Sequence, residues 1–192
     1  MLFRSTVRCL HQVDGCQLLG LGQDWKYERQ GLVSLKRIVE ALRGLQLPAK
    51  DLLNFQRWVM FNYLIGNSDA HAKNISVLID ETGYALAPFY DLMCVQVYGD
   101  DRLALFIGDE DQFASIGAHS WEAFCEDCGF GVKPTLTLFR KMANDVAKAW
   151  VAVSAQAMSD FALSPREVAL IHAITKVIEA NCLAAISMTA KR

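Results

Sequence analysis

The segment from Asp51 to Gly66 constrains the fold more than any other part of the sequence. Asp51 gives it an acidic first turn, and apolar residues then recur at helical spacing: Leu52, Phe55, Val59 and Tyr63. Further apolar residues widen this face: Trp58, Phe61, Leu64 and Ile65. A helix that is apolar over so much of its surface is buried on several sides, and Gly66 ends it. We therefore expect a domain whose core is built around this helix.

Four other segments carry helix signals. Ser34 can cap a helix that runs to about Leu45, with an apolar stripe at Leu35, Ile38, Val39 and Leu42. A short helix is expected over residues 120–128, and a long one from Pro134 to about Met158. The last helix begins at residues 164–167, where a serine cap precedes Pro165 and Glu167, and it runs to about Ile186.

Strand signals are few. Residues 75–79 and 84–87 flank the turn-rich residues 80–83 and predict a β-hairpin, and a short strand is expected at 103–107. Residues 1–31 are interrupted by glycines and predict only short helices and loops. The expected fold is mainly α-helical (α+β), one domain of residues 1–192 with a single small hairpin in its middle.

Composition excludes disorder, because 53% of the 192 residues are hydrophobic. The formal net charge of −2 excludes a strongly basic nucleic-acid-binding chain, but the charges are segregated. Residues 1–50 and 133–192 each hold eight basic and four acidic residues, whereas residues 51–132 hold three basic and thirteen acidic ones. Cation or phosphate chemistry is therefore expected in the middle of the chain.

Six cysteines occur without a secretory leader, so we expect reduced thiols in a cytoplasmic protein: Cys9, Cys16, Cys94, Cys125, Cys128 and Cys182. The single C-x-x-C at 125–128 has no second pair at zinc-binding spacing, which favours free thiols over metal or redox use. No uninterrupted apolar run reaches the roughly 18 residues of a membrane helix, so no membrane contact is expected.

The polar residues 67–74 lie between the apolar helix and the hairpin. Asp69 precedes Asn74 by five positions, and Asp91 follows Asn74 by seventeen, just beyond the second strand. In protein kinases a catalytic Asp, an Asn five positions later and an Asp beyond the next hairpin orient the acceptor hydroxyl and hold Mg²⁺. The alternative is an ordinary solvent loop in which Asp69 is a cap and His71 and Lys73 have no assigned role.

Two segments decide between these interpretations by resemblance. Residues 62–76 closely resemble the catalytic loop of the HipA family, bacterial serine/threonine kinases known as toxins of toxin–antitoxin systems, and residues 86–92 resemble its metal-binding segment. A weaker similarity extends to residues 11–17, to Lys26 and Tyr27, and to the helical tail. The resemblance implies the helical C-lobe of a protein-kinase-like fold.

The resemblance also implies roles for individual residues. Asp69 would be the catalytic aspartate, and Asn74 and Asp91 the Mg²⁺ ligands. His71 and Lys73 would lie near the phosphates of ATP, and Tyr90 beside the nucleotide. The implied partners are an antitoxin that binds operator DNA, similar to HipB, and a substrate protein connected with translation.

A kinase also needs a glycine-rich loop and a lysine on a strand paired with a helix glutamate, and no segment before residue 50 matches these. Gly20 and Gly22 form only a G-x-G fragment, and Lys26 or Lys36 would be a forced choice for the lysine. We therefore expect a C-lobe that needs an N-lobe in trans and has little activity by itself.

Two other function classes stay open. A non-catalytic module could contact an antitoxin or DNA through a basic tail face with Lys133, Arg140, Lys141 and Lys148. Apolar surface left uncovered by a missing lobe would favour self-association, in line with the mean hydropathy of +0.18. A metal-dependent hydrolase is disfavoured, because the sequence has no H-x-H or H-E-x-x-H cluster.

Overall fold

The computed structural model describes residues 10–81 and 83–189. Its helices are α1 (Gly15–Leu18), α2 (Leu35–Gly44), α3 (Ala49–Ile65), α4 (Ala118–Cys128), α5 (Val132–Asp160) and α6 (Pro165–Thr189). Short 3₁₀ helices are η1 (Gln23–Trp25), η2 (Glu28–Gln30), η3 (Ala72–Asn74), η4 (Val95–Tyr98) and η5 (Phe113–Ser115). The predicted mainly α-helical fold is confirmed, and the five long helices lie where the sequence placed them.

Helix α3 is the centre of the core, as its apolar circumference predicts. Phe55, Met60 and Leu64 are fully buried. Tyr63 stacks on Phe113 with ring centroids 5.4 Å apart, and it also meets Trp121 and Phe139 edge-on. Gly66 ends the helix in the left-handed conformation, with φ 72°, where glycine is favoured because it has no Cβ.

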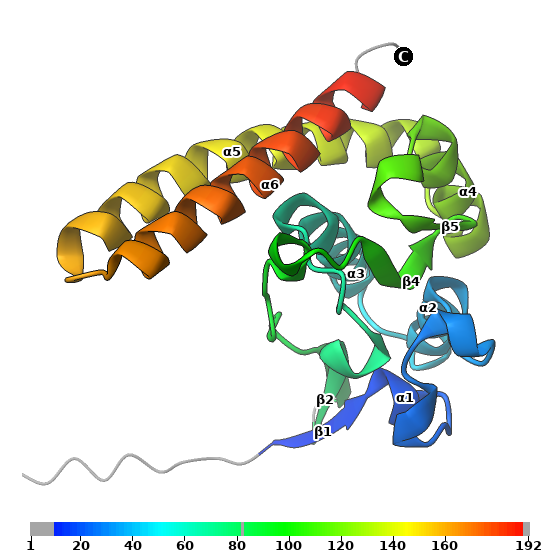
Figure 1. Ribbon diagram of the computed structural model, residues 1–192. Helices are drawn as coiled ribbons and strands as arrows, with labels where there is room; N and C mark the ends of the chain where they lie inside the picture. The colour runs from blue at the N-terminus through cyan, green and yellow to red at the C-terminus, as the bar shows by residue number, and fades with distance from the viewer. Residues whose placement is uncertain (1–9, 82, 190–192) are drawn as a thin grey trace, which may run out of the picture.

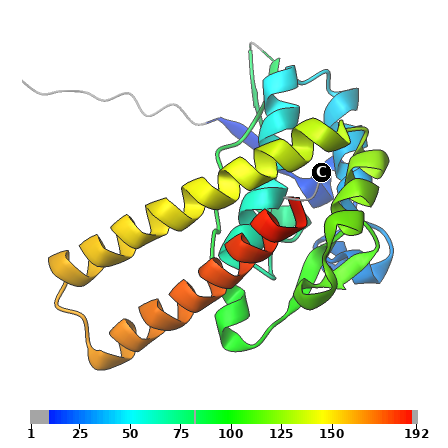
Figure 2. The same ribbon diagram turned by 90° about the horizontal axis from the view of Figure 1, so that it is seen from above.

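Helices α5 and α6 form a long antiparallel pair that crosses one end of α3 and extends beyond the rest of the domain (Figures 1 and 2). The predicted cap at the start of α6 is present: the Ser164 backbone N–H donates a hydrogen bond to Glu167 Oε2 over 2.7 Å. Within the described chain α6 alone is long and apolar enough, by length and composition only, to cross a membrane. Lys176 and Glu179 interrupt its apolar sequence, and 22% of its most apolar 18-residue window is buried within the fold.

The strands form two small antiparallel sheets: β1 (His11–Asp14), β2 (Ser76–Asp80) and β3 (Gly83–Leu86) in the order β1-β2-β3, and β4 (Arg102–Ile107) paired with β5 (Glu110–Gln112). The predicted β2–β3 hairpin is confirmed, although Thr82 of its turn lies outside the described residues. The expectation of one isolated hairpin is wrong, because β1 pairs along β2 from His11 opposite Ile79 to Asp14 opposite Ser76.

Strand β1 lacks an apolar alternation because it is an edge strand of polar sequence whose two faces are at most partly buried. Its pairing depends on backbone hydrogen bonds, which leave no pattern in the side chains. The three-stranded sheet lies on the opposite side of α3 from the α5–α6 pair (Figure 1). The loop between α3 and β2 therefore connects the core helix directly to the central strand of this sheet.

Candidate active site

The loop of residues 66–75 is fixed by backbone hydrogen bonds to three other parts of the chain. Ala104 N of β4 donates to Ser68 O over 2.8 Å, and Gly15 N of α1 donates to Ile75 O over 2.9 Å. Ala72 N donates to Lys26 O over 3.1 Å, which attaches the N-terminal segment to the loop. A loop held at both ends and in its middle can keep polar side chains in one arrangement.

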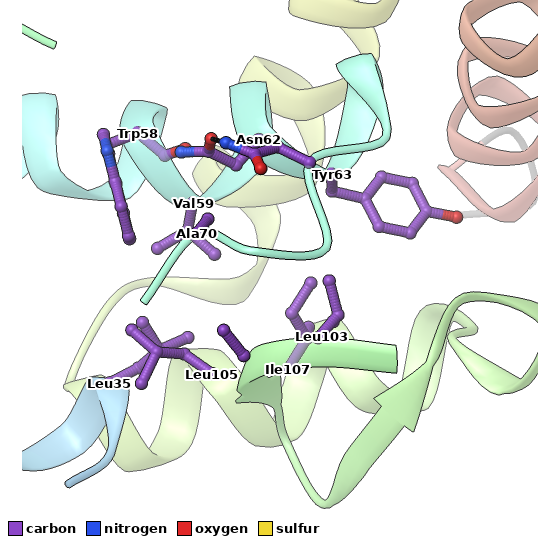
Figure 3. A pocket seen from close by; sticks show the side chains of 11 residues that line it. Leu35, Trp58, Val59, Asn62, Tyr63, Ala70, Leu103, Leu105 and Ile107 are labelled. Carbon is purple, nitrogen blue, oxygen red and sulfur yellow. Dashed lines mark hydrogen bonds between the residues drawn. The ribbon is translucent and has the colours of Figure 1, made fainter. Parts of the chain in front are cut away.

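A small pocket lies beside this loop, lined by Trp58, Val59 and Tyr63 of α3 and by Leu103 and Leu105 of β4 (Figure 3). Its volume of about 20 Å³ is enough for roughly one water molecule. It is far too small for a nucleotide, so this contact between α3 and β4 supports the loop and is not a substrate site.

Asp69 projects from the loop and is half-buried. Its Oδ1 accepts a hydrogen bond from the phenol of Tyr27 over 2.9 Å. His71 N donates both to Asp69 O over 2.8 Å and to Asn74 Oδ1 over 3.0 Å. One backbone amide therefore links the backbone of the predicted catalytic aspartate to the side chain of the predicted metal ligand.

Asn74 and Asp91 meet although the hairpin separates them in sequence. Asn74 is buried, and its Nδ2 donates a hydrogen bond to Asp91 Oδ2 at short range. Asp91 has a φ of 56°, the left-handed region that aspartate tolerates better than most residues. Asn67 Nδ2 donates to Asp91 O over 3.1 Å, so a buried side chain holds this unusual backbone in place.

This pair fits the ligand preference of Mg²⁺. The Asp91 side chain is exposed, so its carboxylate can be reached by an ion. Asn74 Oδ1 accepts one hydrogen bond and keeps a second lone pair. Mg²⁺ is usually held by one or two protein oxygens and otherwise by water and substrate phosphates. Clusters of three or more His, Cys, Asp or Glu side chains are absent from residues 10–81 and 83–189, and a site of this type does not need one.

His71 and Lys73 line a cavity of about 330 Å³ together with Gln23, Asp24 and Lys26. That volume is at the lower end of the range for small-molecule sites. Burial lowers the pKa of His71, although the nearby Asp69 carboxylate acts in the opposite direction. The imidazole is therefore largely neutral at pH 7 and can donate one hydrogen bond, while the two lysines supply positive charge.

The hydroxyl of Tyr90 takes part in a chain of hydrogen bonds within the fold. Gln12 Nε2 donates to Ser76 Oγ over 2.9 Å, Ser76 Oγ lies 2.6 Å from the Tyr90 hydroxyl, and that hydroxyl donates to Lys73 O over 2.5 Å. Burial also raises the pKa of Tyr90. The chain connects β1, β2 and the loop, so the hydroxyl has a structural role, and the expectation that Tyr90 lies beside a nucleotide stays a prediction.

The structure brings all six predicted site residues to the loop and its continuation beyond β3. It adds Tyr27, whose contact with Asp69 has no signal in local spacing because 42 positions separate the two residues. It also adds Asn67, for which the sequence offers one signal, the polar residues at 62 and 67 at the end of an apolar helix. Lys36 does not join the site: it lies on α2 and pairs with Asp127 at 3.4 Å.

The described cysteines are free thiols: Cys16, Cys94, Cys125, Cys128 and Cys182, whereas Cys9 lies outside the described residues. Cys125 and Cys128 are fully buried in α4. Burial raises the pKa of Cys125, and it raises that of Cys128 to about 12. Raised pKa values favour the protonated thiol, the form that is the weaker metal ligand and nucleophile, so the preference for free thiols over metal or redox use stays a prediction.

The sequence of this mainly helical domain matches the model of a known protein family. The family model described as the HipA-like C-terminal domain matches residues 4–150. The chain therefore belongs to the HipA-like C-terminal domain family.

Two curated relatives are kinases by name. The protein Y4mE of Sinorhizobium fredii is 34% identical over 148 residues, which are 76% of this chain and 35% of that protein. The serine/threonine-protein kinase toxin HipA of Shewanella oneidensis is 32% identical over 153 residues, with 72% of this chain and 35% of that protein covered. The chain thus spans about a third of the length of these relatives.

A solved structure has the same fold. It is the complex of HipA and HipB of Shewanella oneidensis MR-1 with its operator DNA, and the similarity has a TM-score of 0.88 at 25% sequence identity. The similarity covers 100% of this chain and 48% of the chain it matches. The fold expected from the HipA resemblance is therefore confirmed.

Proposed function

We propose that this chain is the catalytic C-lobe of a HipA-like kinase, which transfers the γ-phosphoryl group of ATP to a serine or threonine hydroxyl of a protein. The observation that carries the proposal is the contact of Asn74 with Asp91 beside the loop that bears Asp69. Asp69 and Asn74 lie on one loop, and Asn74 contacts Asp91 across the hairpin, which is the order of these residues in kinases. The kinase names of the relatives support the same activity.

Each residue has a role that follows from its surroundings. Asp69 accepts the proton of the acceptor hydroxyl and orients its oxygen for attack. Asn74 and Asp91 would hold Mg²⁺, which when bound neutralises charge on the β- and γ-phosphates. Lys26, His71 and Lys73 line the cavity that we assign to the phosphates. Catalysis of this kind is mainly positioning and charge stabilisation, which suits a loop fixed on three sides.

The proposal includes nucleotide-binding groups that lie outside residues 1–192. Among residues 10–81 and 83–189, β1 and β2 are joined to no glycine-rich phosphate loop, and Lys26 lies beyond a 3₁₀ helix and not on a strand. We therefore propose that nucleotide is held partly by this chain and partly by a second polypeptide segment. We further propose a cytoplasmic location and a substrate protein connected with translation.

A HipB-like antitoxin is the partner we propose. The supporting observation is that the matching solved structure is a complex of HipA with HipB and operator DNA. In a non-catalytic version of this function the chain would contact the antitoxin without chemistry, and DNA only through it. The clustering of Asp69, Asn74 and Asp91 favours the catalytic version, because a binding surface would not require these three side chains together.

The test measures transfer of label from γ-³²P-ATP to the translation-factor fraction of a bacterial extract. The chain is assayed alone and with the N-terminal part of Shewanella oneidensis HipA added, each with Mg²⁺ or EDTA. We expect Mg²⁺-dependent labelling only in the mixture and its loss in Asp69→Asn. The matched control is Asp145→Asn, which removes an exposed carboxylate paired with Lys141.

Two results would contradict the proposal in different ways. Labelling by the chain alone that disappears in Asp69→Asn would show that no second lobe is needed. Labelling that is absent from every mixture, together with no Mg²⁺-dependent ATP binding in calorimetry, would leave only the antitoxin-binding function.

A further inference from the structure

Tyr27 contacts the predicted catalytic aspartate from a distant part of the chain. Its phenol donates a hydrogen bond to Asp69 Oδ1 over 2.9 Å across 42 sequence positions. Within the described part of the chain, no other donor reaches the Asp69 carboxylate. One carboxylate oxygen is therefore fixed, and the other is available to an acceptor hydroxyl.

The backbone on both sides of Tyr27 is attached to the site. Lys26 O accepts from Ala72 N of the loop over 3.1 Å. The Glu28 carboxylate accepts from Phe106 N of β4 over 2.6 Å. Tyr27 N itself donates to Gln30 Oε1 over 3.1 Å, which closes the short η2 turn. Residues 26–28 therefore form a fixed connection between the loop and β4.

The ring of Tyr27 is held as well as its hydroxyl. It meets the His71 ring edge-on, with centroids 5.6 Å apart and an interplanar angle of 76°. Lys26 Nζ and Arg29 Cζ lie 4.9 and 4.7 Å from its centroid, within the range of a cation–π contact.

We propose that Tyr27 is a positioning residue for Asp69, an inference that rests on the function proposed above. Its phenol fixes the rotamer of the aspartate, and its ring joins Asp69 to His71 at the phosphate cavity. A freely rotating carboxylate would spend much of its time pointing away from the acceptor hydroxyl. A misplacement of about 1 Å in such a site can lower the rate on the order of 100-fold.

The contact has a second interpretation, in which the phenol occupies the place of the acceptor hydroxyl and blocks the site. That interpretation requires residues 26–28 to move away when substrate binds. The hydrogen bonds from Ala72 N to Lys26 O and from Phe106 N to the Glu28 carboxylate oppose such a movement. Two oxygens on Asp69 also allow phenol and acceptor to bind together, so positioning is the interpretation that the geometry favours.

The first experiment does not depend on kinase activity. It measures the three-bond Hα–Hβ couplings of Asp69 by NMR in the labelled chain, in the wild type and in Tyr27→Phe, which keeps the ring. We expect couplings of a single rotamer in the wild type and averaged couplings in the variant. Tyr98→Phe is the matched control, because it removes a phenol hydroxyl from a side chain that is 76% exposed.

The second experiment uses the labelled-ATP assay with the N-terminal segment supplied. In Tyr27→Phe we expect kcat to fall on the order of 10- to 100-fold with KM for ATP unchanged, because the phosphate cavity keeps its lining. Arg29→Gln keeps the phenol and should keep kcat, which separates the hydrogen bond from the cation over the ring.

The outcomes separate this inference from the proposed function. Unchanged Asp69 couplings in Tyr27→Phe would overturn the positioning role, whatever the activity. A higher kcat in Tyr27→Phe would also overturn it and establish the blocking interpretation. Averaged couplings in a protein with no labelling activity would confirm the contact and count against the kinase function instead.

Discussion

Asn74, which precedes the β2–β3 hairpin, donates a side-chain hydrogen bond to Asp91, which follows it. The buried side-chain amide of Asn74 thus contacts the exposed carboxylate of Asp91, and we assign both residues to the Mg²⁺ site. Its stability does not depend on a formal charge, because either a carboxylate or an amide oxygen at position 91 can accept from Asn74 Nδ2. Binding of a divalent ion, in contrast, needs the charge.

Asp91→Asn should therefore separate folding from metal binding. Asparagine tolerates the left-handed backbone at position 91 and keeps an acceptor oxygen, so we expect the free energy of unfolding to change by less than about 1 kcal/mol. The affinity for ATP in the presence of Mg²⁺ should fall at least roughly 10-fold, since one full charge of the site is lost. Calorimetric titration with Mg²⁺–ATP, against ATP with EDTA, measures the change.

Asp127→Asn is the matched control, because Asp127 is an exposed carboxylate that pairs with Lys36 on another face. It should leave ATP affinity unchanged. Equal Mg²⁺-dependent affinity in the wild type and in Asp91→Asn would remove Asp91 from the metal site.

The main helices and the order of the site residues could be predicted because they depend on local patterns. The stripe of α2, the caps at Ser34 and Ser164, and the apolar circumference of α3 are all properties of neighbouring residues. The loop was recognisable for the same reason, since a polar run between two apolar elements rarely has another explanation.

Long-range contacts could not be predicted in the same way. The pairing of β1 with β2 depends on backbone groups that every residue has, and β1 contributes little apolar surface. The hydrogen bond from Tyr27 to Asp69 joins residues 42 positions apart, and Lys26 O next to Tyr27 accepts a hydrogen bond from the loop at Ala72 N. The direction of a loop side chain, such as the Tyr90 hydroxyl toward Lys73 O, likewise depends on the completed fold.

Tyr90→Phe should destabilise the domain without weakening ATP binding. The substitution removes the donor to Lys73 O and leaves the Ser76 hydroxyl without that partner, which costs about 1–3 kcal/mol of unfolding free energy. Urea unfolding followed by circular dichroism measures this loss. Tyr84→Phe, at an exposed position of β3, should change stability by less than about 0.5 kcal/mol. A drop in ATP affinity for Tyr90→Phe would instead place the hydroxyl at the nucleotide.

Gly15→Ala tests the close approach of α1 to the loop. A Cβ at this position would lie 2.4 Å from Ala72 O, a backbone atom that cannot turn aside. We expect the free energy of unfolding to fall by about 1–3 kcal/mol and amide hydrogen exchange in residues 72–75 to become faster. Gly44→Ala is the opposite control, because a Cβ there meets nothing within 4 Å and the residue ends α2. We expect Gly44→Ala to raise the free energy of unfolding by about 0.5–1 kcal/mol. A loss of similar size in both variants would show that the close approach to Ala72 O does not explain the effect of Gly15→Ala.

Glu28 gives the domain a pH dependence that can be isolated. Burial raises the pKa of this carboxyl to about 7 in the folded protein, well above its ordinary value of 4.5. Because the folded state holds the proton more tightly than the unfolded state, the contribution of Glu28 to stability is complete below about pH 4.5 and is lost as the pH rises through about 7. The melting temperature should therefore decline over this range.

Glu28→Gln removes the titration and keeps an oxygen for Phe106 N, whose hydrogen bond fixes residues 26–28 beside Asp69. We expect a higher melting temperature than the wild type at pH 8, little difference at pH 5, and a smaller slope between them. Glu40→Gln, at an exposed position of α2, should follow the wild-type slope. Parallel wild-type and Glu28→Gln curves would show that the buried carboxyl is not the titrating group.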